Sequence, residues 1–172
     1  MRLTDWTDYA LRTLLYLGTV ERRATIQEIC DAYGLSRHHL VRVAGKLVRL
    51  GYLEAGRGRG GGIRLAQPPA SLRLGEFVRR VEPRFDLVEC FREDGTCTVT
   101  SACRLKGVLS QALEAFFREL DRHTLADLLE NRVRLGQLLS RSLETQPSPR
   151  AGSPDRRGRR VSRGSRPKPA RP

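Results

Sequence analysis

The sequence has no uninterrupted run of apolar residues long enough to cross a membrane. The longest apolar stretch near its start, residues 11–20, is interrupted by Arg12, Thr13, Tyr16 and Thr19. A transmembrane helix needs about 20 consecutive apolar residues, and this stretch also lacks the cleavage region of a signal peptide. We therefore expect a cytoplasmic protein whose cysteines are thiols rather than disulfides.

The sequence also lacks the motifs on which most enzymes depend. It contains no Gly-Lys-Ser or Gly-Lys-Thr phosphate loop, no nucleophile motif and no paired acid–base constellation. Gly56, Gly58 and Gly61 match a dinucleotide-binding fingerprint, but that motif opens a helix, whereas strand-like residues 63–65 follow here. We therefore expect that the protein is not an enzyme.

Basic charge is abundant but unevenly distributed. The net charge is +13, and residues 145–172 contain nine Arg or Lys and one Asp, which gives this tail +8 and leaves +5 for the body. The tail is rich in Pro, Ser, Gly and Arg, so burial of apolar side chains cannot offset the entropy of ordering it. The sequence predicts a disordered basic tail over residues 145–172, with ordered structure ending near residues 132–143. The tail either raises DNA affinity by counterion release or is only a solvated extension.

Two short helices joined by a glycine turn are predicted at residues 25–51. Thr25 and Glu28 form a capping-box pattern at the start of the first helix. Gly34 can adopt a positive φ and end that helix, and Ser36 is a suitable N-cap for the second. This arrangement is a helix-turn-helix.

A short β-hairpin is predicted directly after the second helix. Residues 52–55 and 62–66 are predicted as strands, and the loop between them is rich in glycine and arginine. A helix-turn-helix followed by such a hairpin is a winged helix, with residues 52–66 as its wing. The expected fold is therefore mostly α-helical with a small β-hairpin wing.

The winged helix points to DNA as a partner. The N-terminal end of the second helix in such motifs enters the major groove and contacts base edges. Arginine pairs well with guanine, and arginines in a glycine-rich loop can neutralise phosphates or enter the minor groove. The alternative is that these side chains form only a solvated polar surface. The candidate DNA-binding residues are Arg37, His38, His39, Arg42, Arg57 and Arg59.

Three of the four cysteines, Cys90, Cys97 and Cys103, are spaced C-x6-C-x5-C. Thiolates are soft ligands that favour zinc, copper(I) or iron–sulfur clusters. No CxxC pair is present, which disfavours an ordinary structural zinc site, and three thiolates leave a four-coordinate site one ligand short. The alternative is three unligated cysteines. Cys30, next to Ile29 on the first helix of the helix-turn-helix, is predicted to be a small core residue.

A long amphipathic helix is predicted after the cysteine loop, at about residues 102–131. Its apolar positions form one continuous stripe, which could join two subunits or pack inside a single chain. These positions are Leu105, Val108, Leu109, Ala112, Leu113, Phe116, Phe117 and Leu120.

Five separated segments of the sequence resemble the NsrR branch of the Rrf family. Members of this branch are bacterial winged-helix repressors that carry an iron–sulfur cluster and sense nitric oxide. The resemblance extends to about residue 129 and predicts an Rrf-type domain over residues 2–131. The matching segments are residues 8–12, 33–41, 56–63, 87–91 and 102–106.

The resemblance implies a homodimer joined by the long C-terminal helix. It also implies a 4Fe-4S or 2Fe-2S cluster held by Cys90, Cys97 and Cys103. In at least some members an Asp near the N-terminus of the partner subunit is the fourth ligand, which maps to Asp8, with Asp5 as a neighbouring alternative. Asp8 could otherwise be an acid in the first turn of a helix, where the helix dipole favours it.

The function implied by this resemblance is that of a repressor of nitrosative-stress genes. Its cluster-loaded dimer binds a palindromic operator, and nitric oxide reacts at the cluster iron and releases the DNA. Lys106 stands where the related IscR regulators have a histidine ligand, which favours the NsrR branch. The spacing between the first two cysteines is longer than expected for this branch and leaves the cluster type open. The alternative is a regulator of the same fold that senses iron, redox state or zinc through the same cysteines.

Overall fold

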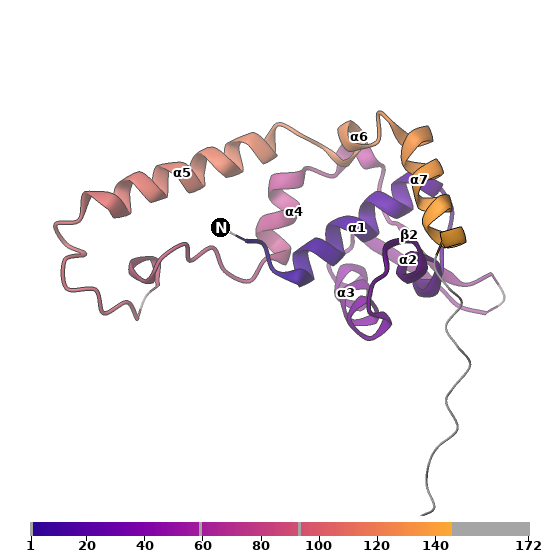
Figure 1. Cartoon of the computed structure of the whole chain (residues 1–172), viewed down its shortest axis with the longest axis horizontal. Coiled ribbons are helices and arrows are strands. Elements are labelled where there is room, and N and C mark those ends of the chain that lie inside the picture. The colour runs from indigo at the N-terminus through magenta and orange to yellow at the C-terminus, as the bar shows by residue number, and fades with distance from the viewer. Residues whose placement is uncertain (1, 59, 93, 146–172) are drawn as a thin grey trace, which may run out of the picture.

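A computed structural model of the chain describes residues 2–58, 60–92 and 94–145 (Figure 1). The basic tail that the sequence predicts to be disordered lies outside the described residues, except for its first residue. The elements in chain order are α1 (Asp5–Val20), α2 (Ile26–Tyr33), α3 (Arg37–Arg49), β1 (Leu53–Gly56), β2 (Gly62–Leu65), a 3-10 turn η1 (Pro69–Ser71), α4 (Leu74–Val81), a second 3-10 turn η2 (Glu89–Phe91), α5 (Arg104–Asp121), α6 (Leu125–Leu128) and α7 (Arg132–Thr145).

Helix α1 is the centre of the core. It contacts α3, α4, α6, α7 and strand β2, and its Ala10 and Leu14 side chains are fully buried. Helices α3, α4, α6 and α7 lie around it, whereas α5 extends away from it (Figure 1). None of the helices among the described residues has the length and apolar character needed to span a bilayer.

The helix-turn-helix forms as its local signals predict. Glu28 N–H donates to Thr25 Oγ1 at 3.2 Å, and Thr25 N–H donates to Glu28 Oε2 at 2.7 Å, which completes the capping box of α2. Gly34 ends α2 with a φ of 65°, a conformation that glycine adopts without strain. Cys30 is 4% exposed, which confirms its prediction as a core residue.

The wing is an antiparallel pair of strands, as predicted, with Leu53 opposite Leu65. Ala24, just before α2, forms an isolated antiparallel bridge to β2: it exchanges backbone hydrogen bonds with Ile63 at 2.8 and 2.9 Å. Gly62 has a φ of 132°, and a side chain there would meet the Ala24 carbonyl oxygen at 2.6 Å. Only glycine therefore lets the wing lie this close to the helix-turn-helix.

The helix predicted at about residues 102–131 is two helices in the structure. α5 ends at Asp121, and α6 begins after Thr124, which forms a capping box with Asp127. Backbone hydrogen bonds also pair this break with the start of α4: Leu74 N–H donates to the His123 carbonyl, and Leu125 N–H donates to the Leu72 carbonyl, both at 2.9 Å. A continuous helix would give up these bonds, so the break is favoured by tertiary pairing.

A further helix, α7, follows where the sequence predicts the end of ordered structure. It packs on α1 and α2, with Leu139 against the core and Arg132 in an ion pair with Glu21. The ordered chain therefore returns to the helix-turn-helix after α5 has extended away from it (Figure 1).

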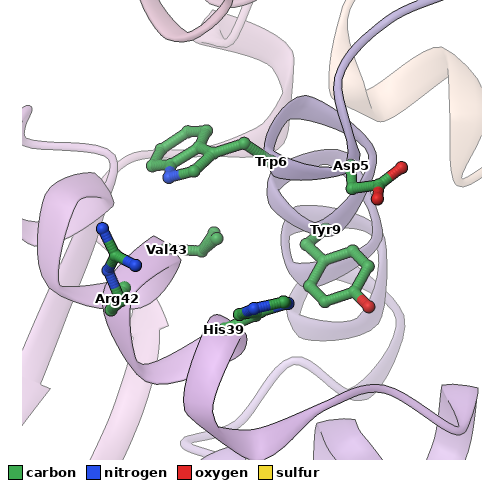
Figure 2. A pocket seen from close by; sticks show the side chains of 6 residues that line it. All are labelled: Asp5, Trp6, Tyr9, His39, Arg42 and Val43. Carbon is green, nitrogen blue, oxygen red and sulfur yellow. The ribbon is translucent and has the colours of Figure 1, made fainter.

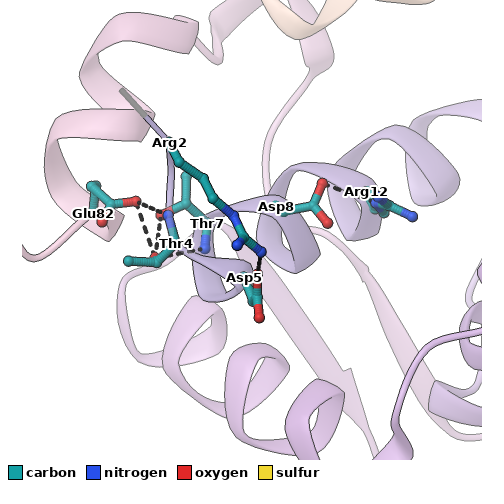
Figure 3. A network of polar contacts seen from close by, with 7 residues as sticks. All are labelled: Arg2, Thr4, Asp5, Thr7, Asp8, Arg12 and Glu82. Carbon is teal, nitrogen blue, oxygen red and sulfur yellow. Dashed lines mark hydrogen bonds and ion pairs between the residues drawn. The ribbon is translucent and has the colours of Figure 1, made fainter.

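Glu82, at the end of α4, anchors the start of α1 (Figure 3). Its Oε2 accepts hydrogen bonds from Thr4 N–H at 3.0 Å and from Thr4 Oγ1 at 3.1 Å, and its side chain is 7% exposed. Thr4 is in turn the N-cap of α1. A buried carboxylate therefore ties two elements that are far apart in the sequence.

We expect Glu82→Ala to lower the free energy of unfolding by about 2 kcal/mol, because it leaves the Thr4 donors without their charged acceptor. Urea denaturation followed by circular dichroism measures this loss. Glu114→Ala, at an exposed position of α5, is the control and should change stability by less than about 0.5 kcal/mol. Equal stability of the two variants would contradict an anchoring role for Glu82.

Candidate DNA-binding surface and cysteine loop

Helix α3 presents a polar face to solvent and an apolar face to the core. Leu40 and Val43 are buried, whereas the side chains of Arg37, His38, His39 and Arg42 are all exposed. All four predicted DNA-binding residues of this helix therefore lie on its N-terminal half and are accessible to a partner.

A cavity of about 210 Å³ lies between α3 and the start of α1 (Figure 2). The His39 ring faces the Tyr9 ring with 6.2 Å between centroids, and Lys46 Nζ lies 4.4 Å from the centre of the Trp6 ring. Arg42 lines the same cavity. The exposed face of α3 therefore contacts the first turns of α1 through aromatic side chains.

Arg57 is exposed at the turn of the wing, and Arg59 lies outside the described residues. Ion pairs link β1 to β2 and to the segment before α2. Glu54 Oε2 accepts from Arg64 at 2.7 Å and lies 3.8 Å from Arg23, which also approaches Gly56. Sequence reasoning missed Arg23, because its partners come from residues far along the chain.

The three spaced cysteines lie on the loop that connects α4 to α5 and in the first residue before α5. Cys97 is exposed, Cys90 and Cys103 are half-buried, and all three are free thiols. Among the described residues, no three His, Cys, Asp or Glu side chains are grouped so that they could hold a metal ion. The three thiols of one chain are therefore present but are not grouped into a metal site among the described residues.

The chemistry of these donors fits an iron–sulfur cluster. Cys103 is the N-cap residue of α5, but its side chain makes no capping hydrogen bond, so the sulfur is not used by the helix. The residues that precede Cys90 and Cys97 are hydrogen-bonded to each other: Glu89 Oε1 accepts from Thr96 Oγ1 at 2.7 Å and from Thr96 N–H at 3.2 Å. Three unpaired thiols within one loop match the soft ligands that such clusters require.

Asp8, the predicted fourth ligand, is paired within its own chain (Figure 3). Its Oδ1 accepts from Arg12 Nε at 2.9 Å, one helical turn along α1. The Arg12 guanidinium also lies 5.8 Å from the centre of the Tyr33 ring at the end of α2. Asp5, the alternative ligand, pairs with Arg2 at 2.7 Å. The i, i+4 spacing of Asp8 and Arg12 is a signal that could have predicted this pair.

The burial of Tyr33 makes the stability of the folded chain depend on pH in alkaline solution. Burial raises the pKa of its phenol to about 12, against the opposing effect of Arg12. Because the folded state favours the neutral phenol, its stabilising contribution is complete below pH 10 and is lost as the pH rises from 10 to 12.

We therefore expect wild-type protein to lose stability more steeply than Tyr33→Phe as the pH rises above 10. Urea midpoints measured at several pH values between 9 and 11 test this difference. Parallel curves for the two proteins would show that Tyr33 ionises equally well in the folded and unfolded states.

Comparison with known proteins assigns this fold to a family. Residues 3–131 match the family model named Rrf2, described as an iron-dependent transcriptional regulator. The HTH-type transcriptional regulator NsrR of Geobacillus kaustophilus (strain HTA426) is 50% identical over 142 residues, which cover 81% of this chain and 97% of that relative.

Solved structures share the same architecture. The IscR protein of T. potens superimposes with a TM-score of 0.61 at 23% identity, covering 76% of this chain and 88% of that one. The oxidized form of CymR from Staphylococcus aureus gives a TM-score of 0.60 at 22% identity, covering 76% and 97% of the two chains. At these identities the likeness establishes the fold alone.

The family model and the NsrR relative are both named as transcriptional regulators, which confirms that the chain is not an enzyme. The resemblance to the Rrf family inferred from the sequence is likewise confirmed, over three quarters of the chain. This protein belongs to the Rrf2 family of transcriptional regulators and is an NsrR-like member of it.

Proposed function

We propose that this regulator is a homodimeric repressor that releases its operator when nitric oxide reaches an iron–sulfur cluster on the cysteine loop. The observation that carries the proposal is the set of three free thiols, Cys90, Cys97 and Cys103, in a chain half identical to an NsrR protein. The cysteine-bearing segment is linked to the DNA-binding half through α4, which contacts both α5 and α1, so a change at one can reach the other.

DNA binding is assigned to α3 and the wing. The exposed arginines and histidines of α3 can enter a major groove, and Arg57 at the wing turn can meet the phosphate backbone beside it. Arg59, beyond the described residues, is proposed for the same role as Arg57. Two such units in a dimer bind the two halves of a palindromic site.

Dimerisation is assigned to α5. The C-terminal end of α5 is fixed to α4, because Arg79 of α4 pairs with Asp121 at 2.6 Å. The Arg79 guanidinium carbon also lies 4.2 Å from the centre of the Phe117 ring. The other end of α5 projects from the rest of the chain with Leu105 and Val108 each 60% exposed (Figure 1). A second copy would cover this apolar surface, which is costly to leave in water.

The cluster would be held by the three loop cysteines, with Asp8 of the second copy as the fourth ligand. When bound, an iron–sulfur cluster supplies iron with which nitric oxide reacts. Arg12 donates to Oδ1 of Asp8 and also contacts Tyr33 on α2. Ligation of iron by Asp8 would draw charge from this pair and compete with it, and α2 would sense the change through Arg12.

Visible absorption of anaerobically purified protein tests this proposal. We expect iron–sulfur absorption in the wild type and in Cys30→Ala, the control that removes the buried cysteine, but its loss in Cys97→Ala. The coloured protein should bind operator DNA, and nitric oxide should abolish both the absorption and the binding. A colourless, metal-free wild type with full operator affinity would exclude the proposal.

The second candidate is a regulator of the same fold that responds to zinc, iron supply or thiol oxidation. The exposure of Cys97 favours it, because an accessible thiol is open to oxidants and to metal exchange. Metal analysis of the same anaerobic preparation separates the candidates: zinc without iron and sulfide, or peroxide-induced release of DNA by metal-free protein, would favour the second.

Two arginine variants test the proposed DNA contacts. Arg42→Ala should weaken binding to the operator by about 1–3 kcal/mol and relax preference for one base pair, since arginine on a major-groove helix reads bases. Arg57→Ala should weaken binding to all sequences alike and reduce the salt slope by about 1, since its contact is a phosphate. Fluorescence anisotropy at several salt concentrations distinguishes them. Identical, small effects of both variants would contradict the assignment of base contacts to α3.

A further inference from the structure

A second cavity, of about 230 Å³, lies between the base of the wing and α4, away from both the cysteine loop and the cavity of Figure 2. The end of α3 closes one side through Leu50 and Gly51. Most of its lining is polar. The polar side chains that line it are Tyr52, Gln67, Ser71, Arg73, Glu76 and Arg80.

The hydroxyl of Tyr52, a residue that lines this cavity, is buried. The residue is 5% exposed, and within the described part of the chain its hydroxyl is the one buried side-chain polar atom without a partner. Buried polar groups in native proteins are almost always paired with protein, water or ligand. Burial raises the pKa of this phenol, and the charge of the Arg80 guanidinium and its donation toward the hydroxyl oxygen act in the opposite direction, so the O–H proton itself is kept and has no acceptor.

The Tyr52 ring is held firmly in place. It packs edge-on against Phe77 with 4.8 Å between centroids, and the Arg80 guanidinium carbon lies 5.6 Å from its centre. Phe77 itself is fully buried in the core. The Tyr52 ring is therefore fixed in place beside the cavity, with its hydroxyl buried.

Charged groups at the cavity follow one face of α4. Arg73, Glu76 and Arg80 are spaced i, i+3 and i+7 along the helix, while Leu74 and Val78 on the opposite face are buried. Glu76 forms no ion pair with any described residue, and Arg73 donates only a long bond, 3.4 Å, to the Asp121 carbonyl. Two guanidinium groups against one carboxylate give the cavity an excess of positive charge.

We propose that this cavity binds a small ligand carrying a carboxylate or phosphate group. Arg73 and Arg80 would engage the oxyanion, the group that guanidinium donors recognise best, and the Tyr52 hydroxyl would donate to it. Glu76 provides an acceptor for an amine or hydroxyl on the same ligand. The volume lies below the roughly 300–1,000 Å³ of sites for drug-sized ligands, which limits the ligand to a small metabolite or an inorganic anion.

Thermal denaturation of the full chain tests this site with two probes, inorganic phosphate and acetate, against chloride at the same ionic strength. We expect a saturable rise in Tm with at least one probe beyond the effect of chloride. Which probe acts distinguishes a phosphate ligand from a carboxylate ligand. Similar curves for all three salts would overturn the proposal.

Three variants decide whether the response arises at this cavity. Arg80→Gln should weaken the effective probe by about ten-fold or more. Tyr52→Phe should raise the Tm without probe, because it removes an unpartnered hydroxyl, and should also reduce the response to the probe. Arg118→Gln makes the same charge change at an exposed position of α5 and should respond like the wild type. An equal change in Tm with the probe in Arg80→Gln and Arg118→Gln would contradict the site. So would a Tyr52→Phe variant whose Tm without probe is lower than that of the wild type and whose response to the probe is unchanged.

Discussion

The fold depends on the burial of α1. This helix contacts the recognition helix α3, the wing strand β2, and α4, α6 and α7. Gly18 permits one of these approaches, since a side chain there would meet the end of Leu129 at 2.6 Å. Asp8 lies on this same helix, and its partner Arg12 contacts α2. A displacement of α1 would therefore be transmitted to the recognition helix, the wing strand and α4, α6 and α7 together.

The parts of the fold predicted correctly from the sequence are those specified by neighbouring residues. The capping box of Thr25 and Glu28 and the positive φ of Gly34 are local, so the helix-turn-helix and wing follow from pattern alone. The break after α5 requires the pairing of residues 123–125 with residues 72–74, which no local periodicity reveals. Helix α7 was missed for a similar reason, because its few apolar side chains matter only where they meet α1 and α2.

The candidate sites also fall into those that local sequence could predict and those that depend on contacts between distant residues. Residue type and spacing were enough to select the three cysteines and the exposed side chains of α3. Spacing could not place the anchor between Glu82 and Thr4, which are 78 residues apart, or the unpartnered hydroxyl of Tyr52. These depend on which surfaces the core brings together. The three cysteines, although close in sequence, are not grouped into a metal site among the described residues, and their spacing alone could not predict this.

Helix α7 has a consequence for the charge that follows it. Because α7 packs on α2, the chain leaves its last described helix beside the helix-turn-helix rather than at the far end of α5. A tether of this kind keeps a binding segment at high effective concentration near its target, so weak contacts add to affinity without any new specific interface. Any contact that the tail, with its net charge of +8, made with DNA would therefore begin next to α2 and add to binding without a specific interface of its own.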